Sequence, residues 1–264
     1  MSISIIILAA GRGTRLNSAV PKVFHEVGNL PIIFHVINSA KKLLPNEIVL
    51  VIGKHMLAYK KQILNLYPDI KICIQEEQKG TAHAVMCCIK KINHRNKNTI
   101  ILYADSPLIT KNSIIKLSKN ILSKKSELCL LAMKAEIQDH YGRLILDKKK
   151  NVKKIVEFSD ANFQEKKITL CNSGVMSFKT ATLLSHLDKI SNKNIKKEFY
   201  LTDLVEILNI AQKNISFEVC KIEETLGINT REDLSNVEKI FQKNKLDSLR
   251  NRGVTVMDPN STFF

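Results

Sequence analysis

The chain has 264 residues and a formal net charge of +16, from 41 Lys and Arg against 25 Asp and Glu. Its cations are mostly Lys, spread along the whole chain without interleaved aromatic residues, so we expect a general attraction for anionic substrates and no dedicated nucleic-acid surface. No run of about 18 apolar residues, signal-peptide pattern or Cys-x-x-Cys spacing occurs, which argues against a membrane span, secretion and structural zinc and favours a reduced, cytoplasmic setting.

The first predicted element is a strand over residues 3–8, where a nearly continuous apolar, β-branched run indicates burial on both faces of a parallel sheet. Residues 9–15, Ala-Ala-Gly-Arg-Gly-Thr-Arg, follow it. Glycines let a backbone approach a ligand closely, and successive free N–H groups at such a turn cradle phosphate oxygens. The spacing fits neither a Walker loop nor a dinucleotide fingerprint, whose third glycine would fall at Leu16. Arg15 and Lys22 add cations, so we predict a nucleoside triphosphate at the carboxyl end of this strand.

An alternation of helices and strands continues along the chain. Apolar residues recur at helical spacing over 31–40, and a second buried strand is predicted over 47–52. A helix over 56–66 and a short strand over 71–74 come next. This order implies right-handed crossovers and a mainly parallel sheet.

The segment after the third strand carries candidate base-binding groups. Gly80 and Thr81 begin a helix whose N-terminal amides would face the crevice. Gln75 can both donate and accept hydrogen bonds, which suits the edge of a base. The alternative is a polar loop with a Thr cap. We leave His83 unassigned, because a His near a helix start is more often structural.

Asp105 follows the fourth predicted strand, residues 99–104. Ligands of open α/β sheets bind beyond the carboxyl ends of the strands, and a carboxylate there is a hard oxygen donor suited to Mg²⁺ beside phosphates. The alternative is a helix or turn cap before Pro107.

The second half of the chain is expected to add a helix over 112–124 and strands over 127–134, 144–146, 152–158 and 168–178, with a hairpin turn at 147–151. Small and polar residues at 172–174 interrupt the last strand, which suggests close approach by a ligand. Gly142, Glu157 and Asn172 would supply a backbone N–H, a carboxylate and an amide, a set suited to sugar hydroxyls and an acetamido group. Taken alone, each of the three fits a structural role as well.

Towards the C-terminus, a helix follows Thr202 and Asp203, either of which is a plausible cap, and a late strand is predicted over 217–222. Asn229 follows in Gly-Ile-Asn-Thr. Thr230 then starts a helix with one apolar and one charged face.

These segments together resemble the bacterial N-acetylglucosamine-1-phosphate uridyltransferases, which are sugar-phosphate nucleotidyltransferases. The shared motifs are Leu-Ala-Ala-Gly-x-Gly-Thr-Arg with a following Pro-Lys, Gln-x-Glu-Gln-x-Gly-Thr-x-His-Ala, Asp-x-Pro-Leu and Glu-x-Tyr-x-Thr-Asp. The family usually has Gly where this chain has Ala104, whose methyl group we expect to narrow the approach to the nucleotide. The resemblance covers essentially all of this chain but only the first half of the bifunctional family protein.

The resemblance implies a Rossmann-like, three-layer α/β nucleotide-sugar transferase fold with a mainly parallel mixed sheet and a C-terminal helical arm. It implies a Mg²⁺-dependent enzyme that makes UDP-N-acetylglucosamine and pyrophosphate from UTP and N-acetylglucosamine 1-phosphate, for peptidoglycan and lipopolysaccharide precursors. Arg15 and Lys22 would be catalytic, and Asp105 and Asn229 would hold the metal and meet in space. The implied nucleotide-binding residues are Leu8, Ala9, Ala10, Gly11, Gly13, Thr14, Gln75, Gly80 and Thr81, and the implied sugar-binding residues are Tyr103, Gly142, Glu157 and Asn172.

We predict a nucleotidyltransferase domain over residues 1–230, a helical arm over 231–252 and, over 253–264, the start of a β-helix whose hexapeptide repeats are otherwise absent. The family's acetyl-CoA site and trimer contacts lie in that β-helix, so we expect no acetyltransferase activity and a monomer or weak oligomer. The alternatives are a UTP-dependent pyrophosphorylase for another sugar 1-phosphate, and a catalytically silent protein that binds nucleotide sugars or nucleic acid.

Overall fold

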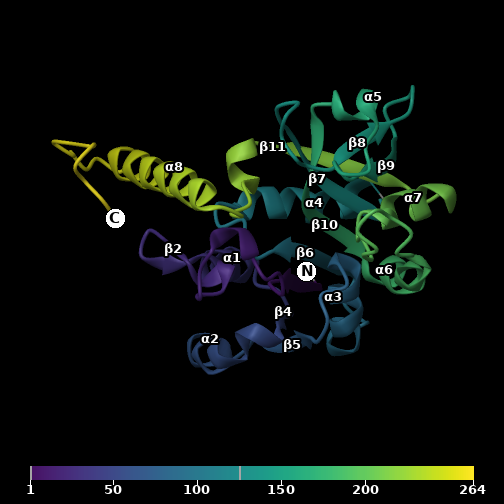
Figure 1. Ribbon diagram of the computed structural model, residues 1–264, viewed down its shortest axis with the longest axis horizontal. Coiled ribbons are helices and arrows are strands. Elements are labelled where there is room, and N and C mark those ends of the chain that lie inside the picture. Colours follow the sequence, from purple (N-terminus) through teal and green to yellow (C-terminus); the bar gives the residue numbers. More distant parts are fainter. Residues whose placement is uncertain (1, 125) are drawn as a thin grey trace.

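The computed structural model describes residues 2–124 and 126–264. Within these residues nine strands form one mixed sheet (Figure 1). They are β1 (Ile3–Leu8), β4 (Glu47–Gly53), β5 (Lys71–Gln75), β6 (Asn98–Tyr103), β7 (Leu128–Lys134), β8 (Arg143–Leu146), β9 (Val152–Val156), β10 (Leu170–Lys179) and β11 (Ile215–Cys220). The main order is β11-β7-β10-β6-β1-β4-β5, and β8 joins β10 to β9.

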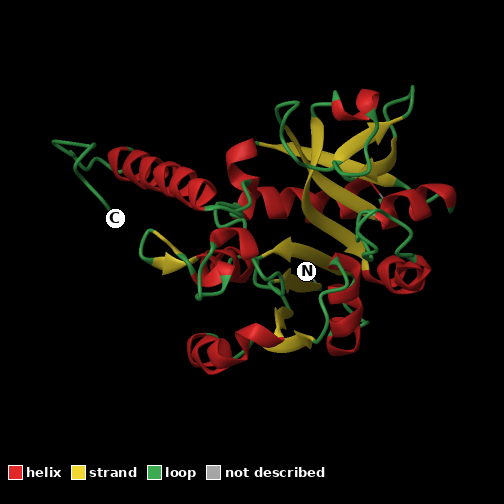
Figure 2. Ribbon diagram, in the orientation of Figure 1, coloured by secondary structure: helices red, strands yellow, loops and turns green. Residues whose placement is uncertain are grey.

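Helices cover both faces of this sheet (Figure 2). They are α1 (Ile32–Lys41), α2 (Lys60–Leu66), α3 (Thr81–Cys88), α4 (Lys111–Lys124), α5 (Phe163–Lys166), α6 (Thr180–His186), α7 (Asp203–Ile210) and α8 (Arg231–Arg250). None of the helices in the described part of the chain has the length and apolar character needed to cross a membrane.

The alternation of side chains along β1 explains the three layers. Ile5 and Ile7 point into a core shared with α1 and α4, whereas Ile6 and Leu8 point into a second core shared with α3 and α7. Because each face of β1 is covered, its residues are all buried, and each such isoleucine contributes roughly 1.5–3 kcal/mol of hydrophobic stabilisation. The three-layer α/β fold with a mainly parallel sheet is therefore confirmed.

The parallel pairing of β6, β1, β4 and β5 brings their carboxyl ends to one edge of the sheet. Leu8 lies opposite Val51 of β4 and Tyr103 of β6, and Gly53 of β4 lies opposite Gln75 of β5. The chain then reverses in β10, which runs antiparallel to both β6 and β7. The loops that leave the parallel strands consequently share one edge, where the site is built.

Several predicted elements differ from the observed ones. The expected helix over 56–66 begins as a 3₁₀ helix, η3 (Lys54–Tyr59), and continues as α2. The last strand of the sheet, β11, begins two residues earlier than predicted, and α5, α6 and a small hairpin of β2 (Glu26–Val27) and β3 (Leu30–Pro31) were not predicted. Thr202 makes no side-chain cap at the start of α7, since its hydroxyl donates to Glu157 Oε1 over 2.9 Å instead.

The long helix α8 projects from the body of the molecule as an arm (Figure 1). It opens with a capping box between Thr230 and Asp233. Its side chains hold the β2–β3 hairpin: Glu238 Oε2 accepts the Gly28 N–H over 2.8 Å, and Phe241 packs where a Gly28 side chain would stand. Residues 253–264 are all described and form neither helix nor strand, so the β-helix start and the domain limits stay predictions.

Candidate active site

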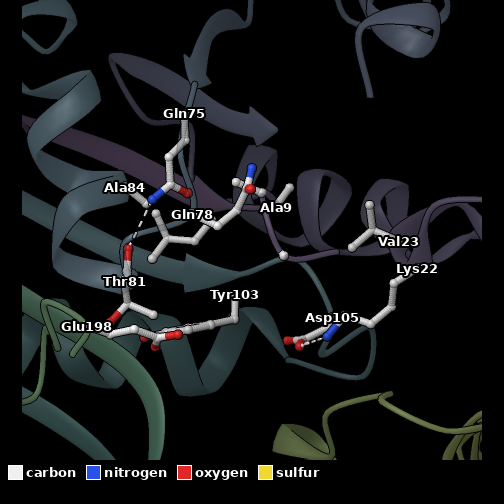
Figure 3. A pocket seen from close by; sticks show the side chains of 14 residues that line it. Ala9, Lys22, Val23, Gln75, Gln78, Thr81, Ala84, Tyr103, Asp105 and Glu198 are labelled. Atoms are coloured by element: carbon white, nitrogen blue, oxygen red, sulfur yellow. Dashed lines mark hydrogen bonds and ion pairs between the residues drawn. The ribbon is translucent and has the colours of Figure 1, made fainter. Parts of the chain in front are cut away.

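A cavity of about 260 Å³ opens at the carboxyl edge of the parallel strands (Figure 3). Ten of the predicted site residues lie along its wall: Leu8, Ala9, Ala10, Gly11, Lys22, Gln75, Gly80, Thr81, Tyr103 and Asp105. Val23, Gln78, Ala84 and Glu198 complete the wall and were not predicted. The loops after β1, β5 and β6 thus form one site.

The glycine loop after β1 shapes one wall of the cavity. Ala9 stays in the sheet, since its N–H donates to Val51 O over 2.8 Å, and Gly11 then faces open space. Gly13 has φ +65°, and a Cβ there would stand 2.4 Å from Lys22 Cβ. This position needs glycine both for its backbone conformation and for the close passage of the lysine stem.

Three predicted phosphate-binding residues lie off the cavity wall. Gly13 supports Lys22, while Thr14 and Arg15 lie in the 3₁₀ helix η1 (Thr14–Leu16) and are exposed. The contacts predicted for Thr14 and Arg15 with a nucleotide remain predictions.

The far end of the cavity carries a fixed amide. Gln75 is 3% exposed, its Nε2 donates to Gly80 O over 3.1 Å, and it lies 3.0 Å from His83 Nδ1. His83, left unassigned from the sequence, therefore orients Gln75. Because its nitrogen contacts both Gly80 O and His83, the Gln75 amide has one fixed orientation toward a planar ligand.

The helix start beside Gln75 is clamped by the chain around Phe199. The Phe199 N–H donates to Lys79 O over 2.8 Å, and Phe199 O accepts from Ala82 N over 2.9 Å. Gly80, at φ +109°, passes so close that a Cβ would stand 2.5 Å from Phe199 O. Thr81 Oγ1 accepts from Leu201 N over 3.0 Å, so this part of the wall is rigid and joins segments far apart in sequence.

The opposite end of the cavity holds a lysine between two oxygen ligands. Lys22 Nζ donates to Asp105 Oδ2 over 2.6 Å and to Asn229 Oδ1 over 3.2 Å. Figure 3 shows the ion pair at the edge of the cavity away from Gln75. The backbone of Ile228 donates to Asp105 O over 3.0 Å, which ties the two loops together. Asp105 and Asn229 therefore meet in space, as expected.

These two oxygens fit a divalent cation. A carboxylate and an amide oxygen already share one positive charge, the Lys22 ammonium, so a cation can be reached by both. No cluster of three or more His, Cys, Asp or Glu side chains suited to a metal occurs in the part of the chain that the structure describes. A Mg²⁺ ion held here would thus take its other ligands from water and substrate phosphates, as Mg²⁺ commonly does.

The predicted sugar-binding residues form a second group that begins at Tyr103. Gly174, at φ +90°, lies against the Tyr103 ring, where a Cβ would stand 2.8 Å from Cε2. β10 shifts its register between Asn172 and Met176, which is the interruption expected from the sequence. The interruption lets the aromatic ring pack directly on the backbone of β10.

The remaining members of this group are close to one another. The Asn172 N–H donates to Gly142 O over 2.8 Å, and a Cβ on Gly142 would stand 3.4 Å from Glu157 Oε2. Burial raises the pKa of Glu157, and burial together with the Glu157 carboxylate raises the pKa of Tyr103. Asn172 is 8% exposed, and its Oδ1 has no hydrogen-bond partner among the described residues. A buried acceptor without a partner costs free energy unless a ligand supplies the donor.

The position where the family usually has Gly does not face the nucleotide cavity. Ala104 is fully buried, its N–H donates to Leu8 O over 2.9 Å, and its methyl group packs in the apolar core with α1 and α4. The expectation that this methyl narrows the approach to the nucleotide is therefore wrong.

The fold and the site define a nucleotidyltransferase: a glycine loop, a fixed amide, and a lysine with two metal-compatible oxygens surround one cavity of a three-layer α/β domain. The chain matches the MobA-like NTP transferase domain over residues 5–165 and belongs to that family.

Curated relatives match nearly the whole chain. "Bifunctional protein GlmU" of Buchnera aphidicola subsp. Schizaphis graminum (strain Sg) is 41% identical over 259 residues, which cover 98% of this chain and 55% of the relative. The protein of the same name from Ruegeria sp. (strain TM1040) is 34% identical over 261 residues, covering 99% of this chain and 58% of the relative. The chain thus spans little more than half the length of these relatives.

Solved structures share the fold. A UDP-glucose pyrophosphorylase complexed with UDP-glucose has a TM-score of 0.74 at 16% identity, and the matched region covers 92% of this chain and 100% of that one. A 4-diphosphocytidyl-2C-methyl-D-erythritol synthase from Anaerococcus prevotii DSM 20548 has a TM-score of 0.65 at 19% identity, covering 91% of this chain and 98% of that one. At these identities the likeness concerns the fold alone.

Proposed function

We propose that this chain transfers the uridylyl group of UTP to N-acetylglucosamine 1-phosphate, which yields UDP-N-acetylglucosamine and pyrophosphate. One observation carries the proposal. A single cavity has Gln75 at one end and the Lys22–Asp105–Asn229 group at the other, and Tyr103 in its wall packs on Gly174, two residues from the buried, unpartnered Asn172.

The base would lie at the Gln75 end. The Gln75 amide and the backbone of Gly80 and Thr81 offer donors and acceptors in fixed positions, which suits the uracil edge. The triphosphate would then follow the glycine loop, where Gly11 is open to a ligand and Lys22 supplies a charge.

The reaction needs no nucleophile from the protein. An oxygen of the sugar phosphate attacks the α-phosphorus of UTP in line, the bond from that phosphorus to the bridging oxygen breaks, and pyrophosphate leaves with the electron pair. Lys22 would stabilise the charge that builds on the phosphates, with Arg15 adding a second cation. Asp105 and Asn229 would hold Mg²⁺, which when bound neutralises phosphate charge and orients the leaving group.

The sugar would lie beside Tyr103, near the bulged part of β10. The free Oδ1 of Asn172 would accept the N–H of the acetamido group, and Glu157 and the Gly142 backbone would face the ring hydroxyls. Because a buried acceptor left without a donor is costly, glucose 1-phosphate should be a poorer substrate.

The test is pyrophosphate release from UTP with a panel of sugar 1-phosphates. We expect N-acetylglucosamine 1-phosphate to be used preferentially, with activity lost in excess chelator. Equal turnover of glucose 1-phosphate would contradict the assignment. If no sugar 1-phosphate gave pyrophosphate release and the protein changed the mobility of random DNA in a salt-dependent way, a nucleic-acid-binding protein would be favoured instead.

We further propose that the protein is cytoplasmic and supplies precursors of peptidoglycan and lipopolysaccharide, and that this chain by itself is a monomer or weak oligomer. Sedimentation analysis tests the last point, and a stable trimer would contradict it.

A further inference from the structure

Lys22 makes its contacts with the same two oxygens that we assign to a metal. Its Nζ lies 2.6 Å from Asp105 Oδ2 and 3.2 Å from Asn229 Oδ1, and the Lys22 side chain is only 10% exposed. The Asn229 amide is turned for this contact, since its Nδ2 donates to Gly227 O over 3.4 Å. The ammonium thus occupies the place that a cation shared by both oxygens would take.

The backbones that carry the two oxygens are held in place, whereas the ammonium ends a flexible side chain. Ile228 N holds the backbone of Asp105, and Asp233 Oδ2 accepts the N–H groups of Asn229 and Thr230, each over 2.8 Å. Lys22 is held at its base, where the Gly13 backbone passes close to its Cβ, but its ammonium ends a flexible four-carbon stem. If a cation entered this site, the group that moves would therefore be the Lys22 ammonium.

A divalent ion and the Lys22 ammonium compete for Asp105 Oδ2. Mg²⁺ binds oxygen at about 2.0–2.1 Å. With Nζ at 2.6 Å from the same oxygen, the two cations would lie at most about 4.7 Å apart in a poorly solvated site, where like charges repel strongly. The ammonium in this position therefore opposes metal binding, and its departure favours it.

We propose that Lys22 is a resident cation, which neutralises Asp105 in the nucleotide-free protein and leaves when a nucleotide brings a divalent ion. Lys22 lines the nucleotide cavity, so phosphate oxygens placed there would draw the ammonium away from Asp105. The proposal rests on the proposed function in placing the metal at Asp105 and Asn229. Its consequence is an order of events: the free protein rejects the divalent ion, and metal and nucleotide enter together.

The test measures Mn²⁺ binding to the nucleotide-free protein by the loss of the free-ion signal in electron paramagnetic resonance. Lys22→Met keeps an unbranched side chain of similar length and removes the charge, so it should bind Mn²⁺ about tenfold tighter or more than wild type, within the usual range of coupling between two binding events. Lys22→Gln serves as a second variant should Lys22→Met fold poorly. Lys54→Met, in an exposed ion pair with Glu76, is the matched control and should leave Mn²⁺ binding unchanged.

A double variant locates the ion. Lys22→Met with Asp105→Asn should lose the gained affinity. Mn²⁺ binding by Lys22→Met and Lys22→Gln that is no tighter than wild type would overturn the proposal, and so would a gain that survives Asp105→Asn. These measurements use neither UTP nor sugar phosphate, so absence of pyrophosphate release by wild type would refute the proposed function without deciding this inference.

Discussion

The two parts of the sheet supply their polar groups by different means. In the parallel part, β1 and β4 are almost entirely buried, and the polar groups of the cavity come from the ends of the strands or the loops that follow them. In the antiparallel part, Asn172 lies within β10 itself, at a register shift, and keeps an unpartnered oxygen. A parallel sheet offers a binding edge without disturbing its strands, whereas the predicted sugar-binding residues depend on a register shift within a strand. We expect changes in the first part to affect chemistry and changes in the second to affect substrate choice.

On the nucleotide side, we expect the largest loss of turnover from Asp105→Asn. The variant removes the only formal negative charge that we assign to the metal site, so turnover should fall on the order of 100-fold or more, with a higher Mg²⁺ requirement. Steady-state pyrophosphate release across a Mg²⁺ titration measures both. Asp69→Asn, in an exposed pair with Lys41, is the control, and a variant at Asp105 with wild-type turnover would remove the carboxylate from the mechanism.

Gly174→Ala tests the packing of Tyr103 on β10. Gly174 has φ +90° and would place a Cβ 2.8 Å from the Tyr103 ring, so alanine should cost roughly 1–3 kcal/mol of stability and raise KM for the sugar phosphate more than KM for UTP. Gly253→Ala is matched in backbone conformation, at φ +86°, but its Cβ would meet no atom within 4 Å. Equal losses of stability in the two variants would show that backbone strain alone matters.

Asn172→Ala tests the sugar choice itself. Removing the free acceptor should reduce the preference for N-acetylglucosamine 1-phosphate over glucose 1-phosphate by about tenfold, the equivalent of one hydrogen bond to a buried group. The ratio of the two kcat/KM values measures it. An unchanged ratio, with the two substrates still well separated, would place the acetamido contact elsewhere.

The smallest expected effect concerns pH. Burial and the Glu157 carboxylate raise the pKa of Asp203 from 3.8 to about 6 in the folded protein. The stability associated with this group is thus present below pH 4 and is lost as the pH rises through about 6. Asp203→Asn should therefore gain on wild type between pH 4 and pH 7, by on the order of 1 kcal/mol because the side chain is partly solvated.

Urea unfolding at pH 4, 5.5 and 7 measures this difference. The exposed Asp188→Asn serves as the control. A constant gap between Asp203→Asn and wild type over this range would show that Asp203 does not titrate there.

The parallel half was largely predictable because its signals are local. A run of apolar residues marked β1 at its observed bounds, and the same pattern marked β4 and β5 to within a residue. Most cavity residues of this half lie at the ends of strands or in the loops that follow them, so their meeting could be inferred from the parallel arrangement alone.

The rest of the site depends on contacts that join distant segments. Glu198 enters the cavity because Phe199 pairs with the start of α3, and Thr202 faces Glu157 rather than capping α7. The motif Glu-x-Tyr-x-Thr-Asp identified this segment as part of the resemblance, but it did not predict that Glu198 would line the cavity. Ala104 illustrates the converse, since its place in the sequence suggested the cavity and its side chain lies in the core.

The position of β10 has a consequence for synthesis on the ribosome. This strand lies between β6 and β7, although it follows both in the chain. Until residues 170–179 emerge, β6 and β7 each present an unpaired edge to other nascent chains, for several seconds at translation rates of about 5–20 residues per second. Because β10 is an inner strand that is synthesised late, the parallel half of the sheet can form early. Its β6 edge then stays unpaired until β10, which carries Asn172, has been synthesised.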